Sequence, residues 1–244
     1  MTADSDDDAS FDMASLAERI EQVKAAPEPR DVRLIILDSM VPGQRLLLDD
    51  APAQLLDCWN AASAAGTPIV MLGSQQVQLN THGVECTMEV EQTANGARVT
   101  IIAGDLVEVC TVGEDEGSRW SGRAATATWT SLDASAPEEQ PTDTLVERMH
   151  ELEGLLVDWL SLVRKTGRER VPRHLENVLA DLGPMPEPEL PSKRALWVAG
   201  LINPLPALGV ALEIRPACLM APTADKRVQV ALMGIKDSIS RLEE

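Results

Sequence analysis

Apolar and polar positions between residues 34 and 60 predict a strand, a turn, a second strand and a helix. The apolar runs at 34–37 and 46–48 have the length of short buried strands, and Pro42-Gly43 marks a turn between them. The next segment repeats apolar side chains on one face of a helix, at Leu55, Leu56, Trp59 and Ala62. This stretch begins a β-rich region that we expect to span residues 31–134.

The clearest local pattern is a β-hairpin in the middle of this region. Residues 84–91 alternate apolar and polar side chains, which is typical of a strand with one buried and one solvated face. Asn95-Gly96 is a preferred two-residue turn. A loop at these two residues predicts that Val90 lies opposite Ile101 in the second strand.

Three further features complete the β-rich region. Residues 67–72 resume a buried strand after the first helix. Gly104 permits a bend or bulge in the second strand of the hairpin. Residues 125–130 alternate Ala and Trp with Thr, which predicts the last strand.

Beyond a linker at residues 135–142 the apolar period changes from 2 to about 3.6, which predicts a helical bundle over residues 143–244. Pro172 introduces a shorter helix and Thr223 caps the last one. Two long helices carry apolar seams with steps of four and three residues, at Leu145, Met149, Leu152, Leu156, Trp159 and Val163, and at Val228, Leu232, Ile235, Ile239 and Leu242. The seams predict packing within the chain, with dimerisation as the alternative.

Residues 195–214 are almost uninterruptedly apolar and have the length of a membrane span. However, Asn203-Pro204-Leu205-Pro206 divides the segment, because proline ends the preceding helix. We therefore expect two buried core helices rather than a span across a bilayer.

The N-terminal 30 residues predict an acidic tail followed by a short amphipathic helix. Four Asp residues within the first eight positions are the opposite of a secretory or transit signal. Like charges with few apolar residues favour disorder in the tail itself. We expect an intracellular protein, in the cytoplasm or an organelle interior, with a presequence outside this numbering as the alternative.

The formal net charge of −18 and the pI of about 4.5 argue against nucleic acid and anionic membranes as partners, because polyanions repel. Tyr is absent and Phe occurs once, so few aromatic platforms are present for stacking. One local basic cluster is expected to be the solvated end of a helix. It comprises Arg164, Lys165, Arg168, Arg170 and Arg173.

No residue pattern indicates catalysis or metal binding. The four Cys residues, at 58, 86, 110 and 218, match no zinc spacing and are expected to be reduced, with a Cys86–Cys110 disulfide as the alternative. His150-Glu151 lacks the second His of a zinc-protease motif and is expected on a helix surface. His82 is expected in a loop and His174 on a helix surface. We therefore expect no catalytic, cofactor-binding or metal-binding residues, and no enzyme.

The order of several short motifs resembles the LON domain, the N-terminal substrate-binding module of the Lon protease family. The resemblance covers roughly residues 32–244. It rests on Val41-Pro42-Gly43 at the family's turn, Leu46 to Leu48 at its strand, Leu55 to Trp59 at its helix, Gly83-Val84-Glu85-Cys86, residues 97–109 with Gly104 at the glycine, residues 124–133, and Arg241-Leu242. The sequence departs from the family where Asp49-Asp50-Ala51-Pro52-Ala53 lacks its Arg and aromatic residue, and where Asp105-Leu106 replaces Arg-Phe.

The resemblance implies an α+β fold, with a PUA-like β pseudo-barrel that holds one helix, followed by the helical bundle. It also implies a non-catalytic module that binds a protein or an unfolded polypeptide segment, without ATPase or protease domains. The sequence identifies no binding residue; Trp120 beside Arg119 is considered as an exposed candidate. The alternatives are an accessory subunit of a larger assembly, an RNA-binding PUA-like module, and an enzyme whose residues show no motif.

Overall fold

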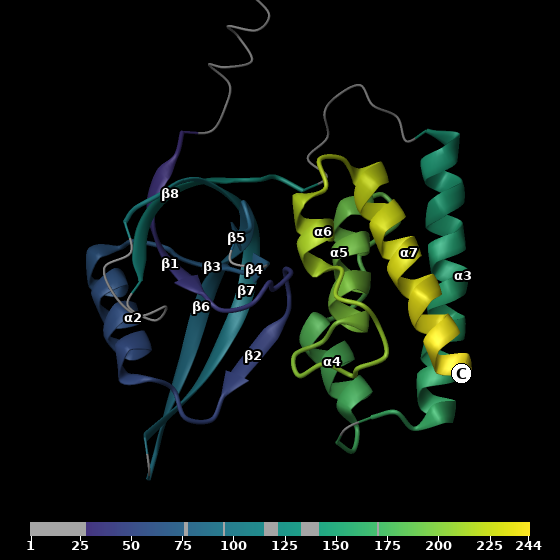
Figure 1. Cartoon of the computed structure of the whole chain (residues 1–244), viewed down its shortest axis with the longest axis horizontal. Coiled ribbons are helices and arrows are strands. Elements are labelled where there is room, and N and C mark those ends of the chain that lie inside the picture. The colour runs from purple at the N-terminus through teal and green to yellow at the C-terminus, as the bar shows by residue number, and fades with distance from the viewer. Residues whose placement is uncertain (1–27, 76–77, 95, 115–121, 133–141, 170) are drawn as a thin grey trace, which may run out of the picture.

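The computed structural model describes residues 28–75, 78–94, 96–114, 122–132, 142–169 and 171–244. In this part of the chain all strands precede residue 130, and every helix except one follows residue 142 (Figure 1). The strands are Arg30–Ile36 (β1), Arg45–Leu48 (β2), Ile69–Leu72 (β3), Ser74–Gln75 (β4), Gln78–Leu79 (β5), His82–Thr93 (β6), Gly96–Val112 (β7) and Arg123–Trp129 (β8). The helices are Ala53–Ala65 (α2), Asp143–Thr166 (α3), His174–Leu182 (α4), Pro191–Ile202 (α5), Arg215–Met220 (α6) and Ala224–Glu243 (α7).

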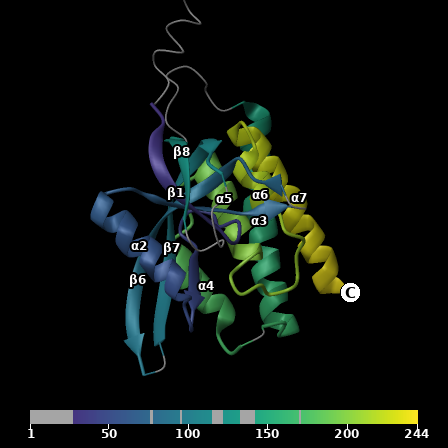
Figure 2. The same cartoon turned by 60° about the vertical axis from the view of Figure 1, so that its left-hand side comes forward.

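Six strands form one sheet in the order β2-β7-β6-β3-β1-β8, and β8 also pairs with β7, so the sheet closes on itself. Helix α2 lies on the side of this barrel away from the helical bundle (Figures 1 and 2). Its buried residues Leu55, Cys58 and Ala62 join the barrel core. The expected α+β class, with one helix inserted among the strands, is therefore confirmed.

The hairpin formed by β6 and β7 has a different register from the predicted one. Val90 lies opposite Val99, not Ile101, because Thr93 rather than Ala94 pairs across the end of the hairpin. The difference is two residues, so every side chain keeps its predicted face of the sheet. Asn95, part of the predicted turn, lies outside the described residues.

The bulge expected at Gly104 is present. Between the pairs Val84–Leu106 and Cys86–Ala103, β7 contains one more residue than β6. A side chain at Gly104 would have its Cβ 3.3 Å from the carbonyl oxygen of Glu85, which is a tight contact. Glycine therefore fits where the two backbones approach each other.

The two long helices bury the predicted seams. All six seam residues of α3 are buried, and in α7 four of the five are buried while Ile239 is partly buried. Thr223 caps α7, since its side chain accepts a hydrogen bond from the Lys226 backbone N–H. α4 begins at His174, so Pro172 precedes the helix and does not stand in its first turn. The seams pack inside the chain, with Trp159 fully buried.

The apolar segment at residues 195–214 is helical only in its first part. α5 ends at Ile202, and residues 203–214 form an irregular loop instead of the second expected helix. Asn203 holds this loop, because its Nδ2 donates to the Leu212 carbonyl (2.9 Å) and its Oδ1 accepts from the Ile214 N–H (3.1 Å). Among the described residues, no helix is long and apolar enough to cross a membrane.

The barrel and the bundle are joined through Gln44, which is buried after the Val41-Pro42-Gly43 turn. Its Nε2 donates to the carbonyls of Gly200 (3.1 Å) and Asn203 (3.0 Å), and its Oε1 accepts from the Val41 N–H (3.0 Å). Next to it the buried Arg215 contacts Glu213 (2.9 Å) on its own segment and Asp38 (3.4 Å) on the barrel. The turn therefore has a fixed position against α5.

Two helical glycines provide a test of this close approach. A Cβ at Gly200 would lie 2.9 Å from Val41 Cγ2 and 3.1 Å from Leu182 Cδ2, whereas a Cβ at Gly154 in α3 meets nothing within 4 Å. We expect Gly154→Ala to raise the free energy of unfolding by about 1 kcal/mol through helix propensity. We expect Gly200→Ala to lower it by about 1 kcal/mol, because overpacking outweighs the same propensity gain. Urea unfolding measures both changes in free energy. Equal gains for the two variants would contradict the close packing of α5 against the Val41-Pro42-Gly43 turn.

Candidate functional site

The candidate site lies where β7 changes partner. Residues 99–102 of β7 pair with β2, and residues 107–112 pair with β8, on the same side of the strand. Between them the Gly43 N–H donates to the Ala103 carbonyl (3.0 Å) and the Thr130 N–H to the Leu106 carbonyl (2.9 Å). The end of β8 and the start of β2 are thus separated by a short gap at the Gly104 bulge.

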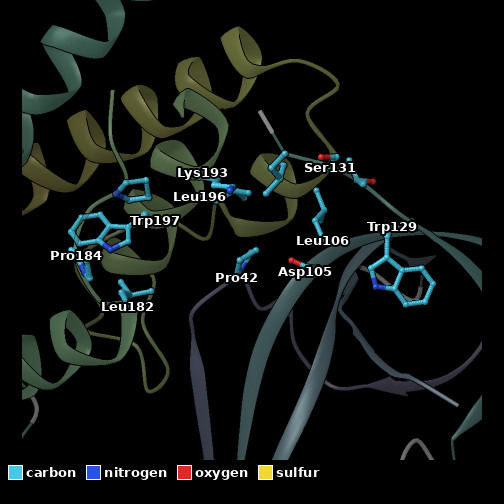
Figure 3. A pocket seen from close by; sticks show the side chains of 13 residues that line it. Pro42, Asp105, Leu106, Trp129, Ser131, Leu182, Pro184, Lys193, Leu196 and Trp197 are labelled. Atoms are coloured by element: carbon cyan, nitrogen blue, oxygen red, sulfur yellow. The ribbon is translucent and has the colours of Figure 1, made fainter. Parts of the chain in front are cut away.

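A pocket of about 440 Å³ opens at this gap, between the barrel and the bundle. Figure 3 shows Trp129 on the barrel side, Trp197, Pro184 and Leu182 on the bundle side, and Pro42 between them. The lining is mostly apolar with a few polar groups, which is typical of ligand pockets. The lining residues are Pro42, Asp105, Leu106, Trp129, Thr130, Ser131, Leu132, Leu182, Pro184, Pro186, Lys193, Leu196 and Trp197.

The barrel wall of the pocket is held by contacts to Trp129. Its Nε1 donates to Glu85 Oε2 at 2.6 Å, and the Arg30 guanidinium lies 4.9 Å from the ring centroid. A cation over an indole face is favourable, so Arg30 and Glu85 together fix the orientation of the ring. Trp129 is only half-buried, so part of its ring surface is available to a ligand.

The bundle wall is formed by α5 and the proline-rich connector that precedes it. Trp197 Nε1 donates to the Gly183 carbonyl at 3.1 Å. The buried Arg194 donates to the Pro186 carbonyl at 2.9 Å and pairs with Glu153 of α3. The connector is therefore held at Gly183 and at Pro186, and this wall of the pocket is already formed in the free chain.

The polar groups of the pocket lie at its mouth. Asp105 and Lys193 are exposed and carry opposite charges, and Thr130 and Ser131 add hydroxyl groups. No group of three or more His, Cys, Asp or Glu with metal-ligand geometry occurs in the described part of the chain. The arrangement is suited to enclosing an apolar side chain while its backbone stays near polar groups.

The three histidines lie apart from one another and from this pocket. His150 is exposed on α3, as expected. His82 is the first residue of β6 rather than a loop residue, and burial is the main factor that lowers its pKa, with Glu108 raising it and Arg227 lowering it. No two of them are placed to act together.

His174 was expected on a helix surface but is buried. It is the first residue of α4, and only 4% of its surface is exposed. Neither ring nitrogen has a hydrogen-bond partner among the described residues. The polar character of His174 suggested the solvated side, whereas the first turn of this helix packs into the core together with Leu175.

The cysteines are free thiols, so the alternative of a Cys86–Cys110 disulfide is wrong. Cys86 is buried and pairs with Ala103, whereas Cys110 is exposed further along β7. Burial raises the pKa of Cys86 and of Cys218 to about 12, and burial also raises the pKa of Cys58. A thiol with a raised pKa carries little nucleophilic thiolate at neutral pH.

These environments predict a simple order of thiol reactivity. At pH 8 the exposed Cys110 should react rapidly with a disulfide reagent such as DTNB, since it is the accessible thiol. Cys58, Cys86 and Cys218 should react only when the chain unfolds, for example in urea. Stopped-flow absorbance gives the number of thiols that react in the fast phase. Cys110→Ser is the control that should remove this phase. Rapid reaction of a second thiol in the native chain would contradict these environments.

The described residues of the basic cluster do not line the pocket. The basic residues Arg164, Lys165, Arg168 and Arg173 are exposed, and Arg164 lies 4.0 Å from Glu176, which fits the solvated helix end. Arg170, Trp120 and Arg119 lie outside the described residues, as do the acidic tail and the expected helix of residues 1–27. The pocket residues were missed because they are distant in sequence. The sequence feature that could have indicated the pocket is the proline-rich connector at residues 183–191, which forms part of its wall.

Comparison with known proteins identifies the fold. No protein-family model matches the chain, and no curated protein is similar enough in sequence to count as a match. Solved structures that are similar to it along most of their length include two Lon N-terminal domains. The N-terminal domain of the Lon protease of the Mycobacterium avium complex is 16% identical, with a TM-score of 0.51 over 86% of this chain and 98% of that one. The Lon N-terminal domain protein of Xanthomonas campestris is 16% identical, with a TM-score of 0.50 over 82% and 95%.

The similarity extends over the barrel and the bundle together, since it covers more than four fifths of this chain. The resemblance inferred from short motifs in the sequence is therefore confirmed at the level of the fold. The chain has the fold of the Lon N-terminal domain.

Proposed function

We propose that this chain is a non-catalytic polypeptide-binding module, which holds an apolar side chain of a protein partner in the pocket between the barrel and the bundle. The pocket itself is the observation that carries the proposal. It presents Trp129, Trp197 and three prolines around about 440 Å³, which is ample for one large side chain. Its walls are held by hydrogen bonds within the chain, so little ordering cost falls on binding.

The fold and the charge support a protein partner. The solved structures that resemble this chain are N-terminal domains of Lon proteases, and the sequence resemblance implies substrate binding for that domain. The net charge of −18 favours basic or neutral segments over nucleic acid. An unfolded segment exposes the apolar side chains that such a pocket can enclose.

The placement of the histidines and cysteines supports a role without catalysis. The three histidines lie apart, and the two thiols with a pKa of about 12 are poor nucleophiles. In the described part of the chain, the pocket contains neither a histidine nor a cysteine. The proposal therefore assigns binding, not catalysis, to this pocket.

The test uses reduced and carboxamidomethylated lysozyme, which is basic and permanently unfolded, as a fluorescently labelled probe. Fluorescence anisotropy should show binding to the full chain, and Ser131→Trp should weaken it about tenfold by filling the pocket mouth. The matched control is Ser63→Trp, which places the same residue on the exposed surface of α2.

Polylysine distinguishes pocket binding from simple attraction between opposite charges. It should bind only at low salt and should not respond to Ser131→Trp. Equal affinity of Ser131→Trp and Ser63→Trp for the unfolded probe would overturn the proposed site. Absence of any binding by the wild-type chain would overturn the proposed function.

A further inference from the structure

Strand β2 stands at an edge of the sheet directly beside the pocket. It is paired on one side only, with β7. Among the described residues, no backbone hydrogen bond joins residues 45–48 to any segment other than β7. Leu47 is 53% exposed on this strand. An edge of this kind presents unpaired N–H and C=O groups to another chain.

The pairing pattern tells which residues face outward. Ala97 and Ala103 of β7 both direct their backbone groups toward the β2 side, where they bond Ala51 (3.0 Å) and the Gly43-Gln44 segment (2.9–3.0 Å). Because bonded and non-bonded pairs alternate along an antiparallel ladder, Leu46 and Leu48 bond to β7.

The N–H and C=O groups of Arg45 and Leu47 are therefore directed to the outer edge of β2. Two residues offer four backbone groups at the spacing that an extended chain matches. This repeat is specific for polypeptide backbone, since no other common ligand provides alternating donors and acceptors at the strand spacing.

The edge is continuous with the pocket at one end and with negative charge at the other. Pro42, three residues before β2, lines the pocket. Asp49 and Asp50 follow β2 and are exposed, Asp49 paired with Arg98 at 3.0 Å and Asp50 without an ion pair among the described residues. From Gly43, next to Pro42, to Asp50 is seven residues along the chain, which an added extended strand spans in about 23 Å.

We infer that the partner segment adds to β2 as an extended strand, with an apolar side chain in the pocket and a basic residue near Asp50, about seven residues apart. This inference rests on the proposed function and specifies the form of its ligand. The pocket selects the apolar anchor, the edge of β2 binds the backbone, and Asp50 selects the charge.

The test uses the full chain and the peptide acetyl-Lys-Thr-Val-Thr-Val-Thr-Gly-Leu-amide, which places Lys at the Asp50 end when it runs antiparallel to β2. Amide hydrogen exchange, read by NMR, should slow at Arg45 and Leu47 about tenfold on binding. Exchange at Leu46 and Leu48 should not change, because these amides already bond to β7.

Two N-methylated isomers of the peptide test the backbone contact. One carries N-methyl groups on its last two Thr residues and the other on its two Val residues, and only the isomer whose methyl groups point away from β2 should bind. Asp50→Lys should weaken binding of the unmodified peptide about tenfold, whereas Asp57→Lys, with the same change of net charge on α2, should not.

Each outcome separates the inference from the proposed function. Equal affinities of the two isomers, or binding of unfolded lysozyme without binding of the peptide, overturn the added strand and leave the pocket in place. Failure of both probes overturns the proposed function as well. Protection of Leu47 in the free chain also overturns the inference; if it rises with protein concentration, a second copy covers the edge.

Discussion

Trp159→Ala is expected to lower the free energy of unfolding by about 4 kcal/mol, the largest loss that we expect from a single substitution in the bundle. Trp159 is fully buried between α3 and α7. Its Nε1 donates to Ser238 Oγ at 2.7 Å, and that hydroxyl donates to the Val210 carbonyl at 2.8 Å. The substitution leaves a large cavity and removes a donor from a buried chain of hydrogen bonds.

Two further variants divide this loss into its parts. Trp159→Phe keeps most of the packing but removes the donor, so it should cost about 1–2 kcal/mol. Val157→Ala, two residues away on the exposed face of α3, should change stability by less than about 0.5 kcal/mol. Urea unfolding followed by circular dichroism measures all three. A loss for Trp159→Ala no greater than that for Val157→Ala would contradict the buried position.

Gln44→Met should cost about 3 kcal/mol although the side chain keeps its length. The substitution leaves the Val41 N–H and the carbonyls of Gly200 and Asn203 without partners in a buried site, and each unsatisfied group costs about 1–3 kcal/mol. Because these groups lie on the barrel, on α5 and on the following loop, the substitution weakens the contact between the barrel and the bundle.

The control for this prediction is Gln54→Met on the exposed face of α2, where no buried group depends on the amide. It should be neutral within about 0.5 kcal/mol. A second measurement connects the joint to the pocket: Gln44→Met should also weaken binding of unfolded lysozyme, since Pro42 is held by the same turn. Unchanged stability would show that water replaces the amide without cost.

The helical seams were predictable because their information is local. In α3 the six apolar positions at steps of four and three are the six that the structure buries. The hairpin shows the limit of the same approach. Alternation has a period of two residues, so a register that is wrong by two residues satisfies it equally well, and only the loop geometry distinguishes Val99 from Ile101 as the partner of Val90.

The prediction of a second helix at residues 203–214 was wrong for a different reason. Apolar composition indicates burial, but it does not distinguish a buried helix from a buried loop with its own hydrogen bonds. Asn203 provides those bonds through its side chain, which the sequence shows only as a polar residue next to proline. The pocket could not be predicted, because no periodic pattern relates Trp129 to Trp197 across the 67 residues of linker, helices and connector between them.

The position of Leu205 indicates that the barrel and the bundle would stay together if the chain between them were cut. It belongs to the loop after α5, yet it packs against the barrel core, while Leu208 and Val210 of the same loop lie in the bundle core. Gln44 reaches in the other direction, from the barrel into the bundle. The two halves thus exchange side chains in both directions, and a cut between residues 133 and 141 should yield fragments that remain associated and copurify.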